Sequence, residues 1–86
     1  MSLHTSHPTI IARLKRASGH LTSVISMLEA QRPCIDIAQQ LQAVEAAITK
    51  AKRELINDHI QHCLEPGHAQ EATTALDELR QIAKFL

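Results

Sequence analysis

The sequence predicts an all-α protein, and its composition and apolar periodicity carry that prediction. Hydrophobic residues make up 44% of the 86 residues, but only Phe85 is aromatic. Leu, Ile, Ala, Gln, Lys and Glu dominate, and these residues favour helices. Two glycines and three prolines leave little material for turns, and no alternating strand pattern is present. A chain of this length forms one domain, so we expect a single helical domain over residues 1–86.

The first helix is expected over residues 8–29. Pro8 suits the first turn of a helix, because its fixed φ angle is already helical. Gly19 lowers the helix propensity without breaking the helix. Residues 31–33 (Gln-Arg-Pro) mark the following turn. The apolar face of this helix consists of Ile10, Ile11, Leu14, Leu21, Val24, Ile25 and Leu28.

The second helix is expected over residues 33–64 and is very long. About 30 residues at 1.5 Å each make a rod of roughly 45 Å, which a first helix of about 22 residues cannot cover. A short third helix is expected over residues 70–85. One continuous stripe along the second helix consists of Ile37, Ala38, Leu41, Val44, Ile48, Ala51, Leu55, His59 and Cys63.

The charge balance and the two cysteines indicate where the protein is located and what it can bind. Nine basic and nine acidic residues give a formal net charge of zero, so DNA binding would need local clusters. We see no signal peptide and no apolar run long enough for a membrane span. Two cysteines without a secretion signal favour metal binding or thiol reactivity over a disulfide. We therefore expect a cytoplasmic protein with no membrane partner.

Two cysteines and one histidine form the candidate metal site. His59 and Cys63 are four residues apart, so they share one helix face. Thiolate and imidazole groups suit copper(I), zinc and related metals. Cys34 lies 25 residues before His59, which is roughly 37 Å along a helix, so it cannot reach that histidine in its own chain.

An antiparallel copy of the second helix resolves this separation. A twofold axis near the middle of the helix places Cys34 of one subunit beside His59 and Cys63 of the other, and symmetry then gives two equal sites. The same pairing covers the unburied part of the long stripe. A buried hydrophobic role is common for a cysteine, and the pattern alone leaves a metal site and a thiol-reactive site both open.

The remaining histidines and the basic residues have ordinary alternative roles. His4 and His7 precede the first helix, where a mobile arm can close over a metal. We expect His20 to play a structural part at a helix or subunit interface. The basic clusters suit either a solvated face or phosphate contact, and no standard DNA-reading motif is present. These clusters contain Arg13, Lys15, Arg16, Lys50, Lys52 and Arg53.

Three segments resemble a known family. They are residues 13–21 (RLKRASGHL), 33–41 (PCIDIAQQL) and 58–63 (DHIQHC). The chain resembles the CsoR/RcnR-type metal-responsive repressors over nearly its whole length, including the spacing of the two cysteines and the histidine.

The resemblance implies an assembly and an activity. It implies a three-helix subunit, an antiparallel four-helix-bundle dimer and a tetramer built as a dimer of dimers. It also implies a repressor that binds a GC-rich inverted-repeat operator as apoprotein. Metal binding would release the DNA and derepress an efflux or detoxification operon. No small organic substrate is implied.

The resemblance also assigns residues by position. Cys34, His59 and Cys63 match the primary metal ligands, with one metal ion per subunit shared across the dimer interface. Glu78 matches an acidic residue next to the site in copper sensors. Pro33 replaces a tyrosine found in some of them. We assign DNA binding to Arg13, Arg16, Lys50, Lys52 and Arg53, of which Arg13, Lys50 and Arg53 match family positions.

The donor set bears on which metal binds. Nickel(II) usually takes at least one ligand more than two thiolates and one imidazole, and His4 or His7 can supply it. In nickel and cobalt members the usual N-terminal ligand position falls on Ser2 here. We favour nickel(II) or cobalt(II), with copper(I) as the alternative, because the sequence around His4 and His7 and the run at residues 58–63 (DHIQHC) resemble nickel and cobalt members.

Three other functions each fit part of the sequence pattern. One is a thiol- or aldehyde-responsive repressor using Cys34, although His59 and Ser2 differ from such proteins. An enzyme built on a Cys–His pair needs a pocket and an oxyanion-stabilising loop, and little loop exists here, so we expect no enzyme. A coiled-coil adaptor would explain the stripe, but not two thiols placed beside His59.

Overall fold

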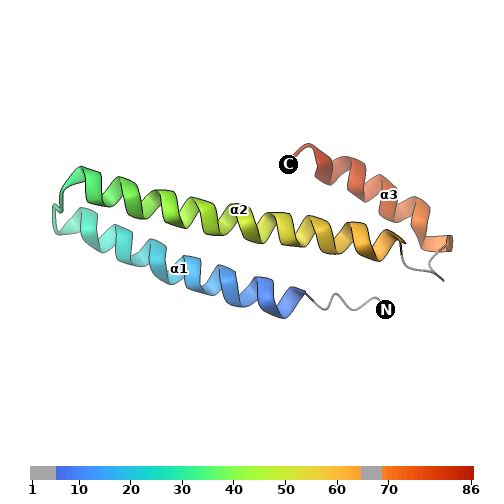
Figure 1. The fold of residues 1–86 in the computed structure, drawn as a ribbon, viewed down its shortest axis with the longest axis horizontal. Helices are drawn as coiled ribbons and strands as arrows, with labels where there is room; N and C mark the ends of the chain where they lie inside the picture. Colours follow the sequence, from blue (N-terminus) through green and yellow to red (C-terminus); the bar gives the residue numbers. More distant parts are fainter. Residues whose placement is uncertain (1–5, 65–68) are drawn as a thin grey trace.

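The computed structural model contains three helices, α1 (His7–Glu29), α2 (Cys34–Leu64) and α3 (Ala69–Ala83). The structure describes the backbone of residues 6–64 and 69–86, and the side chains of residues 6–61 and 76–86. α1 and α2 form a long antiparallel hairpin, and α3 folds back along the second half of α2 (Figure 1). The expected all-α subunit with a long second helix is confirmed.

The turn between α1 and α2 is set by local backbone hydrogen bonds. The N–H of Arg32 donates to the carbonyl of Met27 (3.0 Å), and the N–H of Gln31 donates to Leu28 (3.1 Å). Gln31 has a φ of 56°, the left-handed conformation that ends a helix in this pattern, more commonly found at glycine. Pro33 follows, and its carbonyl accepts the N–H of Asp36 in the first turn of α2.

The α1–α2 contact is built on seven-residue repeats. All buried positions of α1 and three of the four on α2 recur every seventh residue, which keeps one seam of each helix facing the other; the fourth is Ile56. Val24 is 1% exposed and packs with Ile37 and Val44 at the centre of this core, beside Met27. The seam consists of Ile10, Ala17 and Val24 on α1 and Ile37, Val44 and Ala51 on α2.

The apolar stripe of α2 divides into two faces. Ile37, Val44 and Ala51 lie under α1. The other face remains uncovered within one subunit: Leu41, Ile48 and Leu55 are 44%, 46% and 45% exposed. A second uncovered apolar surface follows α1 and consists of Ile11, Leu14, Leu21, Ile25 and Leu28.

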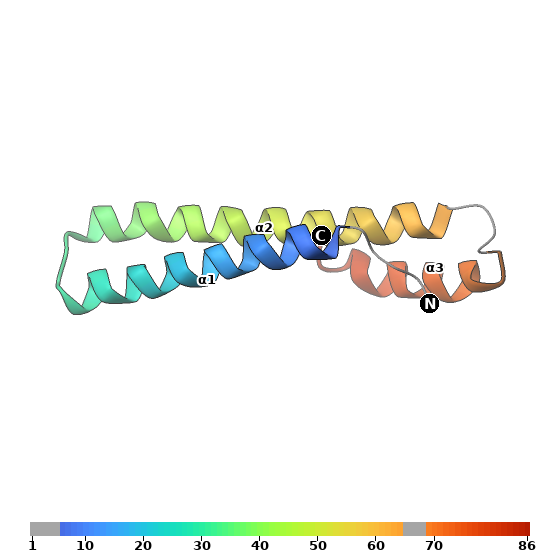
Figure 2. The same ribbon diagram turned by 90° about the horizontal axis from the view of Figure 1, so that it is seen from below.

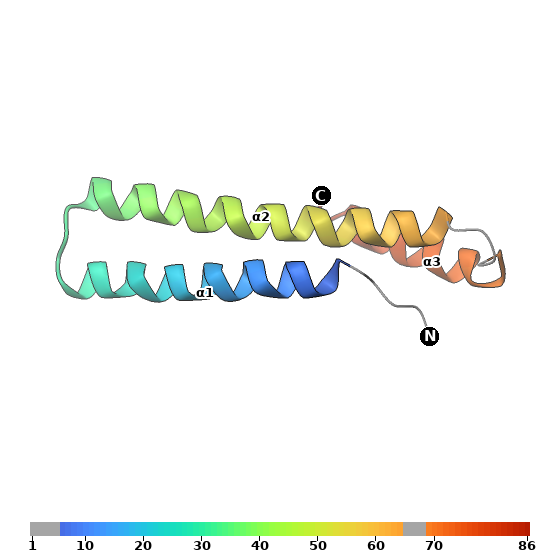
Figure 3. The ribbon, with the colours of Figure 1, turned by 60° about the horizontal axis from the view of Figure 1, so that its bottom comes forward.

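The subunit is a rod. It measures 55 × 24 × 13 Å, and its radius of gyration is 17.3 Å, whereas a compact domain of this length has a radius of about 12 Å. α1 and α3 lie one after the other along α2, as Figures 2 and 3 show. No helix in the described part of the chain is long and apolar enough to cross a membrane. The expected dimer and tetramer stay predictions, because the structure holds one chain.

Candidate metal centre and basic groove

His59 lies on α2, with its side chain 12% exposed and facing α3. Its Nε2 is 3.8 Å from Oε2 of Glu78, whose side chain is 60% exposed. α3 places Glu78 there by folding back along α2. The distance suits an ion pair when the histidine is protonated and is too long for a direct hydrogen bond. The structure therefore brings together two of the residues that the resemblance assigned.

His7 lies close to the same site. It begins α1, and its Nε2 is 3.8 Å from Oδ2 of Asp58, the neighbour of His59 in the sequence. His7 and His59 both line a mostly apolar cavity of about 520 Å³ between the start of α1, α2 and the end of α3. His4, the other N-terminal candidate, lies outside the described residues. The cavity is lined by His7, Lys52, Leu55, Ile56, His59, Ile82 and Phe85.

Cys34 lies at the opposite end of α2. It is an exposed free thiol at the first residue of the helix. Because α2 is one unbroken helix, the 25-residue separation from His59 corresponds to roughly 37 Å. Cys63 belongs to the last turn of α2, and its side chain lies outside the described ones. Among the described residues, no three metal-ligating side chains gather in one subunit.

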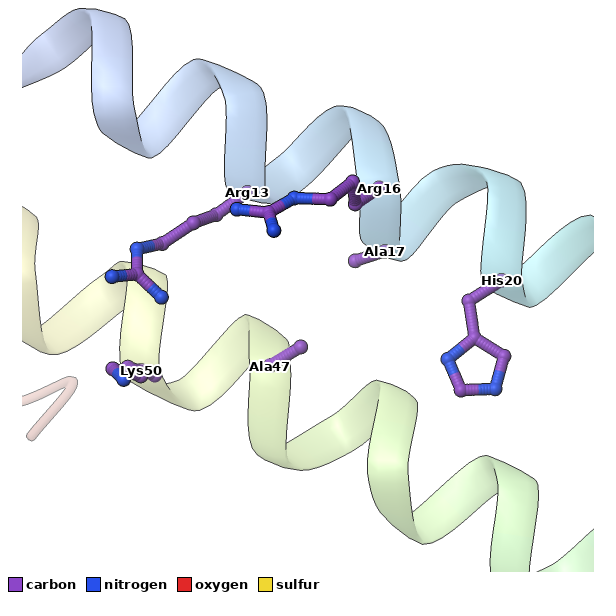
Figure 4. Close-up of a pocket in the computed structure, with 6 residues that line it drawn as sticks. All are labelled: Arg13, Arg16, Ala17, His20, Ala47 and Lys50. Atoms are coloured by element: carbon purple, nitrogen blue, oxygen red, sulfur yellow. The ribbon is translucent and has the colours of Figure 1, made fainter.

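A basic groove lies between the middle part of α1 and the facing part of α2. It has a volume of about 250 Å³, and Ala17 and Ala47 leave room between the helices. Figure 4 shows the long side chains of Arg13 and Arg16 reaching from α1 and Lys50 placed on α2. The lining consists of Arg13, Arg16, Ala17, His20, Ala47 and Lys50.

Glu54 lies beside this groove and faces Arg13. Nε of Arg13 is 3.1 Å from Oε2 of Glu54, and each side chain is about 30% exposed. The Nε atom is buried, and its N–H direction does not meet hydrogen-bond geometry. We therefore describe the contact as an ion pair.

The remaining assigned basic residues do not line the groove. Arg53 lines a neighbouring hollow together with Lys50, Glu45 and Thr49. Lys52 lines the cavity of His59 instead. The five assigned residues therefore divide among three surfaces, and Lys50 borders two of them.

Comparison with known proteins decides the family. Residues 6–84 match the family described as metal-sensitive transcriptional repressor. The chain belongs to this family. Its members are transcriptional repressors and not enzymes.

Individual proteins similar to this chain are also metal-responsive repressors. The chain is 36% identical over 74 residues to the copper-sensing transcriptional repressor CsoR of Mycobacterium ulcerans, covering 85% of the chain and 63% of that protein. It therefore spans less than two-thirds of the mycobacterial protein. It is 31% identical over 96 residues to CsoR of Bacillus subtilis, covering 98% of the chain and 95% of that protein.

A solved structure is also similar. The nickel-responsive transcriptional regulator InrS superposes with a TM-score of 0.80 and 27% identity, covering 100% of this chain and 99% of that one. Proteins similar to this chain therefore include both copper-sensing and nickel-responsive regulators.

The structure adds three polar residues that sequence reasoning missed. Gln40, Glu54 and Asp58 each contact a side chain of α1. Gln40 and Glu54 are separated by two seven-residue steps, with Ala47 between them, and they flank the buried seam. That spacing is visible in the sequence and could have placed them at the α1–α2 interface.

Proposed function

We propose that this protein is a metal-responsive repressor that binds operator DNA as apoprotein and releases it when Cys34, His59 and Cys63 bind a metal ion. The supporting observation is the uncovered face of α2. It carries Cys34 at one end and exposed apolar side chains along its length, and it leads to His59, which α3 of the same subunit partly covers. Within one subunit the three proposed ligands do not meet, and the apolar face has no partner surface to cover it.

An antiparallel pair of α2 helices completes both. The point half-way between Cys34 and Cys63 falls beside Ile48, which is 46% exposed. A twofold axis at this point sets Ile48 against its own copy and Leu41 near Leu55 of the other subunit. It also carries each Cys34 to the His59 end of the other helix. The exposed apolar surface of α1 supports a further association of dimers into a tetramer.

The proposed inducer is nickel(II) or cobalt(II). His7 and His59 line one cavity, so an imidazole is available to extend a site of two thiolates and one imidazole. The similar InrS structure is named as nickel-responsive. Copper(I) is the second candidate, because CsoR relatives are named as copper-sensing and copper(I) is satisfied by fewer ligands. A thiol- or aldehyde-responsive repressor is the third, supported by the exposure of Cys34.

The proposed DNA-binding surface is the basic groove with its neighbouring hollow. Arg13, Arg16, Lys50 and Arg53 gather there although the whole chain is neutral. Such a local cluster suits contact with DNA phosphates. We take the operator to be a GC-rich inverted repeat, and the location to be the cytoplasm.

Coupling between the two sites runs along α2. A metal ion would bridge the beginning of one α2 to the end of another, and Lys50 and Arg53 lie on that helix between the bridged ends. A small change in the angle between the helices would move the basic residues away from their phosphates. Couplings of this kind are about 1–3 kcal/mol.

The decisive experiment measures DNA binding with and without metal. Fluorescence anisotropy uses a labelled duplex of the promoter region upstream of this gene, at fixed salt. We expect stoichiometric nickel(II) or cobalt(II) to weaken binding at least about tenfold, and DNA to weaken metal binding by the same factor. Equal affinities with metal occupancy confirmed would contradict the proposal.

The same assay identifies the metal. Nickel(II), cobalt(II) and copper(I), the last under anaerobic conditions, are compared on the same apoprotein. His7→Ala should weaken nickel(II) binding and leave copper(I) binding nearly unchanged, because copper(I) needs fewer ligands. Release by copper(I) alone would favour the second candidate, and release by an aldehyde or polysulfide in metal-free buffer the third.

A further inference from the structure

His20 is a fourth polar side chain in the basic groove, beyond the basic residues already assigned to DNA. It is half-buried on α1, one turn after Arg16 and Ala17. Figure 4 shows its ring extending from α1 towards α2, at the end of the groove away from Arg13 and Lys50. A histidine changes charge between about pH 5 and pH 8, which arginine and lysine do not.

One ring nitrogen of His20 is held by α2. Nε2 lies 2.6 Å from Oε1 of Gln40. An amide oxygen only accepts hydrogen bonds, so with this amide orientation Nε2 carries a hydrogen and donates it. Nδ1 of the neutral ring is then a lone-pair acceptor. In Figure 4 the ring nitrogen next to the Cβ-bearing carbon, Nδ1, lies on the side of the groove.

The charges around this ring favour an anion in the groove. Arg13 and Arg16 approach from α1 and Lys50 from α2, while Glu54 is the acidic group that pairs with Arg13. A neutral Nδ1 would present its lone pair to a phosphate oxygen, which is unfavourable. A protonated Nδ1 would instead donate an N–H, and charge-assisted hydrogen bonds of this kind are among the stronger ones.

We propose that the groove binds a DNA backbone phosphate and that this binding takes up one proton from solvent at Nδ1 of His20. The Nε2–H stays on Gln40, and the ring becomes an imidazolium paired with the phosphate. DNA affinity then rises as the pH falls through the range in which histidine titrates. The proposal rests on the proposed function, because it takes DNA as the ligand.

The test uses a DNA duplex of arbitrary sequence at low salt, because phosphate contacts carry no sequence information. Apoprotein in a chelating buffer removes protons linked to metal binding. Affinity is measured against salt at a pH near each end of the histidine range. In the wild type the slope of log affinity against log salt should steepen at the lower pH by about 0.9 for each groove that engages a phosphate. His20→Gln should lose this steepening, because glutamine stays neutral.

A matched control and a direct readout isolate His20. His62→Gln changes a histidine twelve residues beyond Lys50, about 18 Å along α2, and should keep the pH dependence. The ¹⁵N shifts of the His20 ring, recorded at one fixed pH with and without the duplex, should move towards the imidazolium pattern when the duplex is added. Circular dichroism confirms that each variant is folded.

The outcomes separate this proposal from the proposed function. Equal pH dependence in wild type and His20→Gln, with DNA still bound, overturns the role of His20 and leaves the repressor intact. Ring ¹⁵N shifts of His20 that do not change when DNA binds do the same. Failure to bind either the arbitrary duplex or the promoter duplex overturns both.

Discussion

Glu54 is the residue whose charge most directly opposes the basic groove. Its carboxylate lies 3.1 Å from Nε of Arg13, at the edge of the surface proposed to bind phosphates. Glu54→Gln keeps the side-chain shape and removes this negative charge. We expect tighter DNA binding in anisotropy measurements, because Arg13 loses a competitor for the phosphate. The stability should change by no more than about 1 kcal/mol, since the pair is partly exposed.

A charge-matched control separates local from global effects. Glu29→Gln makes the same change at the exposed end of α1, far from the groove, and should alter DNA affinity much less. Weaker DNA binding by Glu54→Gln would show instead that Glu54 holds Arg13 in its binding position.

Cys34 decides at the residue scale whether the metal site is shared between subunits. Nickel(II) or cobalt(II) bound to its thiolate should give an intense near-ultraviolet charge-transfer band. Cys34→Ala should remove most of this band while the helical circular dichroism stays unchanged, because the thiol is exposed in the single subunit. An unchanged band would mean that Cys34 does not bind the metal.

Helix α1 carries a glycine where the subunit does not need one. Gly19 lies in the middle of the helix, and a Cβ added there would have no neighbour within 4 Å. Gly19→Ala should therefore raise the free energy of unfolding by about 0.5–1 kcal/mol through helix propensity. Thermal unfolding at fixed protein concentration measures this. A lower melting temperature would reveal that another subunit packs closely against this part of α1.

At the scale of the whole molecule, we expect the subunit to assemble with further copies of itself. A rod with a radius of gyration of 17.3 Å and a row of half-exposed apolar residues along α2 cannot bury its own apolar surface. Ile48→Glu places two carboxylates at the proposed twofold axis, so we expect the dimer to dissociate in sedimentation velocity. The charge-transfer band should be lost at the same time, although Ile48 is not a ligand.

Gln39→Glu serves as the control for this change. It introduces the same charge on α2 at an exposed polar position outside the Leu41–Ile48–Leu55 row, and should leave the assembly intact. A wild-type protein that sediments as a monomer, or an Ile48→Glu variant that still assembles, would contradict the antiparallel pairing.

The sequence by itself determined the helices and the separation of the candidate ligands. Apolar residues at three- and four-residue steps predict helices, and Pro8 and Pro33 stand next to two helix starts. The distance between Cys34 and His59 follows from the helical rise alone, so the incomplete site in one subunit was predictable.

Only the tertiary structure decided how the faces and side chains are paired. The stripe of α2 is wider than one seam, so periodicity cannot say that Val44 faces α1 while Ile48 stays open. The register of the hairpin, set by the turn at Gln31, determines which side chains meet across it. It brings His20 to Gln40 and Arg13 to Glu54, contacts between residues twenty or more positions apart that no local pattern encodes. The fold-back of α3 places Glu78 beside His59 for the same reason, because contacts across helices depend on packing and not on helical propensity.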